Sequence, residues 1–331
     1  MCPARSAGGR TGPVSTGLFA RQMVAEPDPD HPGRYHVDVD PRWNCPAVPH
    51  GGTMAAIAGA AMARELGDGA GDQLLRTLTT VFAAPVPAGP VTVDVSVLRR
   101  GRSMSQASAT VRAAGAATGH TTVAVFGADR PGFEFTDLAM PEVDAPEDCP
   151  SFSDPPPPGV ELAEGPVIPF WQHTEGRPAL GHAPWDDWVP DTSSCAAWYR
   201  FDEPPLRPDG TLDPLAVVAL SDLMPSAVGE RMGPGGVDWW GPSTDLTVHL
   251  LGEARSGWLL SHQRAHRATS GYASVASDLF DTEGTLVAHA TRSCSSPSRA
   301  GRPRATTACR PTSGAEVGPV TGLADWRRWR S

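Results

Sequence analysis

Residues 212–251 read LDPLAVVALSDLMPSAVGERMGPGGVDWWGPSTDLTVHLL. Apolar positions in Leu215–Met232 predict one amphipathic helix, and Thr244–Leu251 alternates apolar and polar residues as a strand does. A single carboxylate, Asp222, falls inside the apolar part of the expected helix. Because a buried charge without a partner is costly, an acid at this position predicts a specific role.

The composition narrows the class of protein. The chain has 331 residues, 40% of them hydrophobic and 19% charged, which is typical of a globular protein with two domains or one double-sized domain. The formal net charge is −10, and no basic stripe interleaved with aromatic residues occurs in the middle of the chain, so we expect no nucleic-acid partner. The sequence offers no apolar run of membrane-spanning length and no signal-peptide core, which predicts a soluble, cytoplasmic protein.

Metal and cofactor motifs are also missing from the sequence. The six cysteines are scattered, without a CxxC pair or a His/Cys cluster, so we expect neither a zinc site nor a disulfide framework. No phosphate-binding loop or dinucleotide fingerprint occurs. The prediction is therefore of a protein with no metal and no cofactor.

The chain carries the same order of elements twice. The first series is a strand at 34–39, an Ala/Gly-rich helix that follows Pro49-His50-Gly51-Gly52 and ends at Gly67, and strands at 74–82, 91–99, 103–112 and 121–127. The second series is a strand at 195–201, the helix at 215–232, and strands at 244–251, 258–267, 271–280 and 286–293. One constant offset aligns Thr77–Phe82 with Thr244–His249 and Arg100 with Arg267, which favours a duplication. The predicted organisation is a flexible N-terminus (1–16), a first repeat (17–128), a Pro-rich linker (129–190), a second repeat (191–296) and a disordered basic tail (297–331).

A long helix followed by an antiparallel four-stranded run, occurring twice, resembles the hotdog fold in its fused double form. More narrowly, the chain resembles the tandem-hotdog, acyl-CoA thioesterase II-like family of the thioesterase-like superfamily. Four motifs carry the resemblance: Pro49-His50-Gly51-Gly52, Leu220-Ser221-Asp222, Pro242–His249 and Gly284–Arg292. It covers about residues 15–296 and implies an α+β fold of two repeats, each an antiparallel β-sheet wrapped around a long central helix.

The resemblance also implies a catalytic site. In that family an Asp on the second helix, a Thr or Ser opening the next strand and a Gln on the last strand hold the attacking water. These roles fall on Asp222, on Ser243 with Thr244 as second choice, and on Arg292 in place of the Gln. Arginine cannot accept a hydrogen bond and brings a fixed positive charge, so the replacement implies either lost hydrolysis or a different substrate.

Each candidate also has a purely structural explanation. Asp222 could pair with an arginine such as Arg231 or Arg292, and hydroxyls after Pro242 are common turn residues. The backbone N–H groups of His50, Gly51 and Gly52 could stabilise an oxyanion at a helix N-terminus, or the glycines could simply let the chain turn.

The expected function is hydrolysis of an acyl-CoA or acyl-carrier-protein thioester, in lipid or secondary metabolism, by a chain that could form homo-oligomers. One alternative is a hotdog dehydratase or hydratase, which the absence of a His after Asp222 in the helix disfavours. The other is a biosynthetic accessory protein that binds an acyl group without turning it over.

Overall fold

The computed structural model describes residues 17–67, 71–160, 167–183, 185–223, 226–234 and 241–295. The segments predicted to be a flexible N-terminus and a disordered tail, 1–16 and 297–331, lie outside these ranges. Within the described ranges, no helix is long and apolar enough to cross a membrane.

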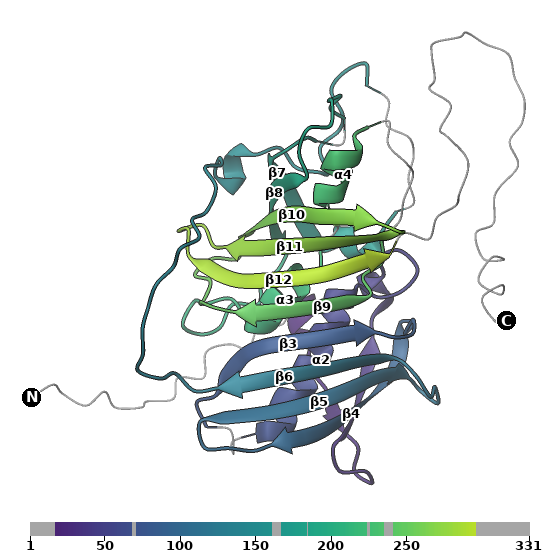
Figure 1. Cartoon of the computed structure of the whole chain (residues 1–331). Coiled ribbons are helices and arrows are strands. Elements are labelled where there is room, and N and C mark those ends of the chain that lie inside the picture. The colour runs from purple at the N-terminus through teal and green to yellow at the C-terminus, as the bar shows by residue number, and fades with distance from the viewer. Residues whose placement is uncertain are drawn as a thin grey trace, which may run out of the picture.

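Twelve strands form one antiparallel sheet, in the order β1-β2-β4-β5-β6-β3-β9-β12-β11-β10-β8-β7 (Figure 1). Ten of them confirm the strands predicted from the sequence, with boundaries close to those expected. The strands are β1 Glu26–Pro27, β2 Arg34–Val39, β3 Leu74–Phe82, β4 Gly89–Arg99, β5 Met104–Ala113, β6 His120–Gly127, β7 Thr174–Leu180, β8 Ser194–Phe201, β9 Asp245–Leu250, β10 Leu259–Thr269, β11 Tyr272–Phe280 and β12 Leu286–Ser295.

The middle of the sheet joins the two halves of the chain. Strands β3 and β9 pair antiparallel there, with Thr79 opposite Thr247 and their hydroxyl oxygens 3.1 Å apart. Outward from β3 the order is β6, β5, β4, β2, and outward from β9 it is β12, β11, β10, β8. The strands that correspond by the sequence offset therefore hold corresponding places on either side of the centre.

The helices in the described ranges are α1 Leu18–Gln22, α2 Gly51–Leu66, α3 Pro214–Leu220 and α4 Ser226–Met232, with 3₁₀ turns η1 Pro41–Trp43, η3 Pro146–Asp148 and η4 Pro169–Gln172. In Figure 1, α2 and α3 lie behind the strands of the sheet. Helix α2 contacts β3, β4, β5 and β6 and packs against α3. A Cβ on Gly52 would lie 2.4 Å from the carbonyl oxygen of Ala219, so only glycine allows α3 to approach α2 this closely.

The prediction of one continuous helix over Leu215–Met232 is wrong. The chain forms two short helices, and Asp222 lies in the turn that follows α3 rather than inside a helix. The Ser221 hydroxyl donates to the carbonyl of Val217 at 2.7 Å, a bond that competes with regular helix geometry.

The predicted linker, 129–190, contributes structure that the sequence analysis missed. Its strand β7 pairs with β8 at the edge of the sheet, and Pro178 is tolerated there because an edge strand has one unpaired side. The Gly and Pro residues of TEGRPAL hide the strand pattern. The same segment supplies Phe170, which is fully buried beside Trp43.

We predict that Gly52→Ala lowers the free energy of unfolding by about 1–3 kcal/mol, because the new methyl group meets the backbone of α3. Gly229→Ala is the matched control, since a Cβ at that helical position meets no heavy atom within 4 Å. Urea unfolding followed by circular dichroism measures both. Equal stability of the two variants would contradict the close packing of α2 on α3.

Candidate active site

The carboxylate of Asp222 is the centre of a buried polar cluster. The residue is 6% exposed, and its Oδ1 accepts two hydrogen bonds. The Ser243 hydroxyl donates one at 2.7 Å, and Arg292 Nη1 donates the other at 3.0 Å. The structure thus brings together three of the predicted catalytic residues from distant parts of the sequence.

Strand pairing explains why Ser243 and Arg292 meet at this carboxylate. Ser243 forms an isolated bridge with Cys294, two residues beyond Arg292 on β12. The second-choice hydroxyl, Thr244, belongs to a different contact. Its Oγ1 lies 3.1 Å from Asp245 Oδ1 and 3.0 Å from the carbonyl oxygen of Ser293, so it does not join the Asp222 cluster.

The second carboxylate oxygen, Oδ2, faces the first turn of α2. Among the described residues, no hydrogen-bond donor reaches it. A Cβ on Gly51 would lie 2.5 Å from Oδ2, so glycine is what allows the start of α2 to approach this oxygen closely. The free backbone N–H groups at the start of α2 also make its N-terminus a favourable neighbour for a negative charge.

His50 holds the backbone of the Asp222 turn. Its Nε2 lies 2.8 Å from the carbonyl oxygen of Asp222, which can only accept, so Nε2 carries a proton. Its Nδ1 lies 3.4 Å from the Thr53 hydroxyl, and its ring contacts that of Phe170, 4.3 Å away. Burial lowers the pKa of His50 despite the opposing charge of Asp222, which keeps the imidazole neutral.

The three residues predicted to stabilise the oxyanion, His50, Gly51 and Gly52, have different contacts. The two ring nitrogens of His50 are engaged by Asp222 and Thr53, so the ring serves to position the turn. Both glycines lie against Asp222. A Cβ placed on Gly52 would come 2.8 Å from the Cβ of Asp222, and a Cβ placed on Gly51 would come 2.5 Å from its Oδ2. An oxyanion role for their backbone N–H groups stays a prediction.

Three further residues around Asp222 were missed by the sequence analysis. Burial, aided by the Asp222 charge, raises the pKa of Cys45 to about 12. Burial lowers the pKa of His120 to about 4, and its ring packs edge-on against Phe82, 5.0 Å away. Cys45 lies just after η1, Phe82 in β3 and His120 in β6, and no local sequence signal connects them to Asp222. In the part of the chain that the structure describes, no three His, Cys, Asp or Glu side chains gather as metal ligands do.

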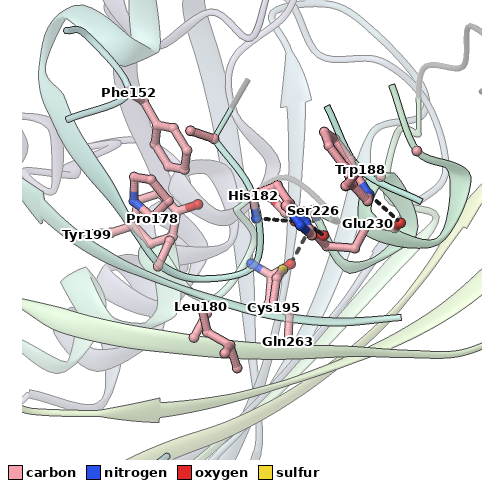
Figure 2. A pocket seen from close by; sticks show the side chains of 15 residues that line it. Phe152, Pro178, Leu180, His182, Trp188, Cys195, Tyr199, Ser226, Glu230 and Gln263 are labelled. Atoms are coloured by element: carbon pink, nitrogen blue, oxygen red, sulfur yellow. Dashed lines mark hydrogen bonds and ion pairs between the residues drawn. The ribbon is translucent and has the colours of Figure 1, made fainter. Parts of the chain in front are cut away.

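A cavity of about 280 Å³ lies between β7, β8 and α4. Figure 2 shows Tyr199, Cys195 and Gln263 on its wall, with the His182–Glu230 pair on another side. Burial raises the pKa of Cys195 to about 12 and also raises that of Tyr199, while the nearby charge of Arg292 acts in the opposite direction on both. Arg292 therefore lies within electrostatic reach of Asp222 and of this cavity wall.

Two family models match the sequence. The model of an acyl-CoA thioesterase N-terminal domain matches residues 39–127, and that of an acyl-CoA thioesterase C-terminal domain matches residues 146–295. The chain belongs to the acyl-CoA thioesterase family. The second match begins inside the predicted linker, in keeping with the place of β7 beside β8 in the sheet. No curated protein matches this member of the family.

Solved structures show the hotdog fold for this acyl-CoA thioesterase family member. A protein of unknown function with a hotdog fold from Alicyclobacillus acidocaldarius is 24% identical, with a TM-score of 0.69, over 86% of this chain and 99% of that one. A putative thioesterase II from Thermobifida fusca is 20% identical, with a TM-score of 0.69, over 87% and 100%. An acyl-CoA thioesterase II from Mycobacterium marinum is 19% identical, with a TM-score of 0.65, over 86% and 100%.

Removing the cation of the buried pair should be costly. We predict that Arg292→Met lowers the free energy of unfolding by about 3–5 kcal/mol at pH 7, because it leaves the Asp222 carboxylate buried without its cation. Adding Asp222→Asn should restore most of the loss. Arg264→Met, at an exposed position of β10, is the control and should change stability by less than about 0.5 kcal/mol. A double variant no more stable than Arg292→Met would contradict the pairing.

The buried histidines predict a pH dependence of stability. His50 and His120 both have a folded-state pKa below the ordinary 6.5, so their contribution is complete above pH 6.5 and is lost as the pH falls. For His120 the loss between pH 6.5 and 5 is about 2 kcal/mol, at 1.4 kcal/mol per pH unit. His120→Asn should make the urea midpoint of unfolding depend less on pH between pH 7.5 and 5. An unchanged slope would contradict a neutral, buried His120.

Proposed function

We propose that the chain hydrolyses acyl-CoA thioesters, with Asp222 as the general base for an attacking water. The observation that supports this is the unequal use of the two Asp222 oxygens. Ser243 and Arg292 fix Oδ1, whereas Oδ2 has no donor among the described residues and faces the α2 N-terminus. A carboxylate held at one oxygen and open at the other can accept a proton in a defined direction.

The reaction then proceeds in two steps. Asp222 Oδ2 takes a proton from water as the water oxygen attacks the thioester carbonyl, and a tetrahedral oxyanion forms. The C–S bond breaks as the oxyanion collapses, and the proton passes from Asp222 to the departing CoA sulfur. The products are a carboxylic acid and free CoA thiol, and no acyl-enzyme is involved.

The other residues around Asp222 have separate roles in the proposed reaction. Ser243 orients the carboxylate, and Arg292 offsets its charge. We assign stabilisation of the oxyanion to the backbone N–H groups of Gly51 and Gly52, because the first N–H groups of a helix have no intrahelical acceptor. Arg292 cannot accept a hydrogen bond from the water as the family's Gln does, so this role passes to Asp222 alone.

We further infer that the two halves of the chain are two hotdog repeats with one working site. The matching strand orders around β3 and β9 support the duplication. The constant offset places Asp222 on Ala55 of the first repeat, and the stretch from there to Ala61, including Ile57–Ala61, contains no acid, so we infer that only the second repeat has a base. The proposal also includes an acyl-carrier protein as an alternative donor of the acyl group. It further includes assembly of the chain into homo-oligomers.

A second candidate function is acyl binding without turnover. The observation that favours it is the replacement of the family's Gln by Arg292, whose bond to Asp222 occupies the carboxylate that must act as base. Measured thiol release separates the two functions directly.

Thiol release from a panel of acyl-CoAs tests the hydrolase. We expect Asp222→Asn to lower kcat about 10²–10⁴-fold, the usual contribution of a general base. Ser243→Ala should lower it about 10-fold, by loss of one hydrogen bond to a charged group. Thr244→Val is the matched control and should retain wild-type activity, because the Thr244 hydroxyl lies outside the cluster.

Two results would overturn the proposal. One is a folded wild-type protein that binds acyl-CoA yet releases no thiol from any substrate, which would favour acyl binding. The other is an Asp222→Asn variant as active as the wild type, which would remove Asp222 as the base.

A further inference from the structure

One edge of the Arg292 guanidinium has no partner. The residue is 4% exposed, and Nη1 donates to Asp222. In the part of the chain that the structure describes, Nε and Nη2 are buried and have no acceptor. The Nε–H bond and one Nη2–H bond of a guanidinium point side by side, so the unpaired groups form a complete two-donor edge.

An unpaired donor edge in the interior is costly. A buried donor without an acceptor costs about 1–3 kcal/mol, and more for a charged group. Two such donors on one permanently charged side chain are therefore a favourable place for an acceptor to bind. The spacing of the two donors matches the two oxygens of a carboxylate, which arginine binds in a bidentate manner.

We propose that this edge of Arg292 binds a carboxylate at the end of the acyl group, so that the substrate is the CoA thioester of a short dicarboxylic acid. The inference rests on the proposed function, because it names the acyl class for the same site. Asp222 and the acyl carboxylate occupy different edges of one guanidinium. A short acyl chain can therefore place its thioester near Asp222 and its far end on Arg292.

Three buried polar residues lie on the same face of the sheet as Arg292, beyond Val275, which is its direct partner in β11. Ser261, Gln263 and Ser277 lie in neighbouring strands and are 3%, 2% and 4% exposed. Gln263 pairs with Cys195 on one side and with Ser277 on the other, so the polar row continues to the wall of the cavity.

The charges also permit an anionic acyl group. Asp222 and Arg292 offset each other in the free protein, so a bound carboxylate adds one negative charge to the site. The bidentate bond and the N-terminus of α2 beside Asp222 favour that charge. A substrate without the carboxylate leaves both donors unpaired, and sites of this kind discriminate strongly against such analogues.

The same edge could instead bind the oxyanion of the tetrahedral intermediate. In that case Arg292 would assist every acyl group equally, whatever its far end carries. Matched substrate pairs separate the two roles, because an isopropyl group has the shape of a carboxylate and no acceptor. Malonyl-CoA against isovaleryl-CoA and glutaryl-CoA against 5-methylhexanoyl-CoA are two such pairs.

The experiment measures kcat/KM for both members of each pair in the wild type, Arg292→Gln and Arg292→Lys. We expect the wild type to prefer the acid in at least one pair. The acid-to-neutral ratio should fall on the order of 100-fold in Arg292→Gln, which loses the charge and the two-donor edge. Arg292→Lys keeps the charge without the edge and should retain an intermediate preference.

Two results would overturn the inference while the hydrolase proposal stands. One is a wild type that prefers the neutral member of both pairs. The other is an acid-to-neutral ratio unchanged in Arg292→Gln, which means that acid and neutral substrates lose activity equally. If the wild type releases no thiol at all, the hydrolase proposal fails. Equilibrium binding of S-(3-carboxypropyl)-CoA against S-(4-methylpentyl)-CoA then decides the inference. Tighter binding of the acid that Arg292→Gln removes supports it, and equal binding overturns it.

Discussion

The buried charge of Asp222 is the constraint on which this site depends. A carboxylate in the interior needs a cation and further donors, and the chain supplies them from a strand 70 residues away and from a hydroxyl 21 residues away. Both lie where β12 pairs with the segment that leads into β9. The strands of the second half of the chain therefore bind Oδ1 of Asp222, while the start of α2, in the first half, lies beside Oδ2.

The first half of the chain packs closely against the Asp222 turn. The two glycines at the start of α2 have no side chain to separate that helix from the Asp222 turn, and neutral His50 ties its ring to the turn's backbone. Phe170, from the segment predicted to be a linker, packs on His50. One carboxylate is thus surrounded by three separate parts of the chain, which explains why a methyl group on Gly52 should affect stability and the site together.

Much of the fold was predictable because strand periodicity is a local property, and ten strands lie where their alternation indicated. The secondary-structure predictions were wrong where particular side chains override the pattern of apolar and polar residues. The Ser221 hydroxyl competes with regular helix geometry in the apolar segment, and β7 has too many Gly and Pro residues to be recognised as a strand. Asp222, Ser243 and Arg292 were predicted by resemblance to a family. Cys45, Phe82 and His120 could not be, because only the folded sheet brings them near Asp222.

The central claim is that Asp222 activates water and does not itself attack the thioester. A single turnover in ¹⁸O-labelled water, with enzyme in excess over acyl-CoA, tests it directly. The account predicts that the released carboxylic acid carries one ¹⁸O atom, and that mass spectrometry finds none in the peptide containing Asp222. An unlabelled product together with ¹⁸O in that peptide would show a covalent anhydride on Asp222 and would contradict the account.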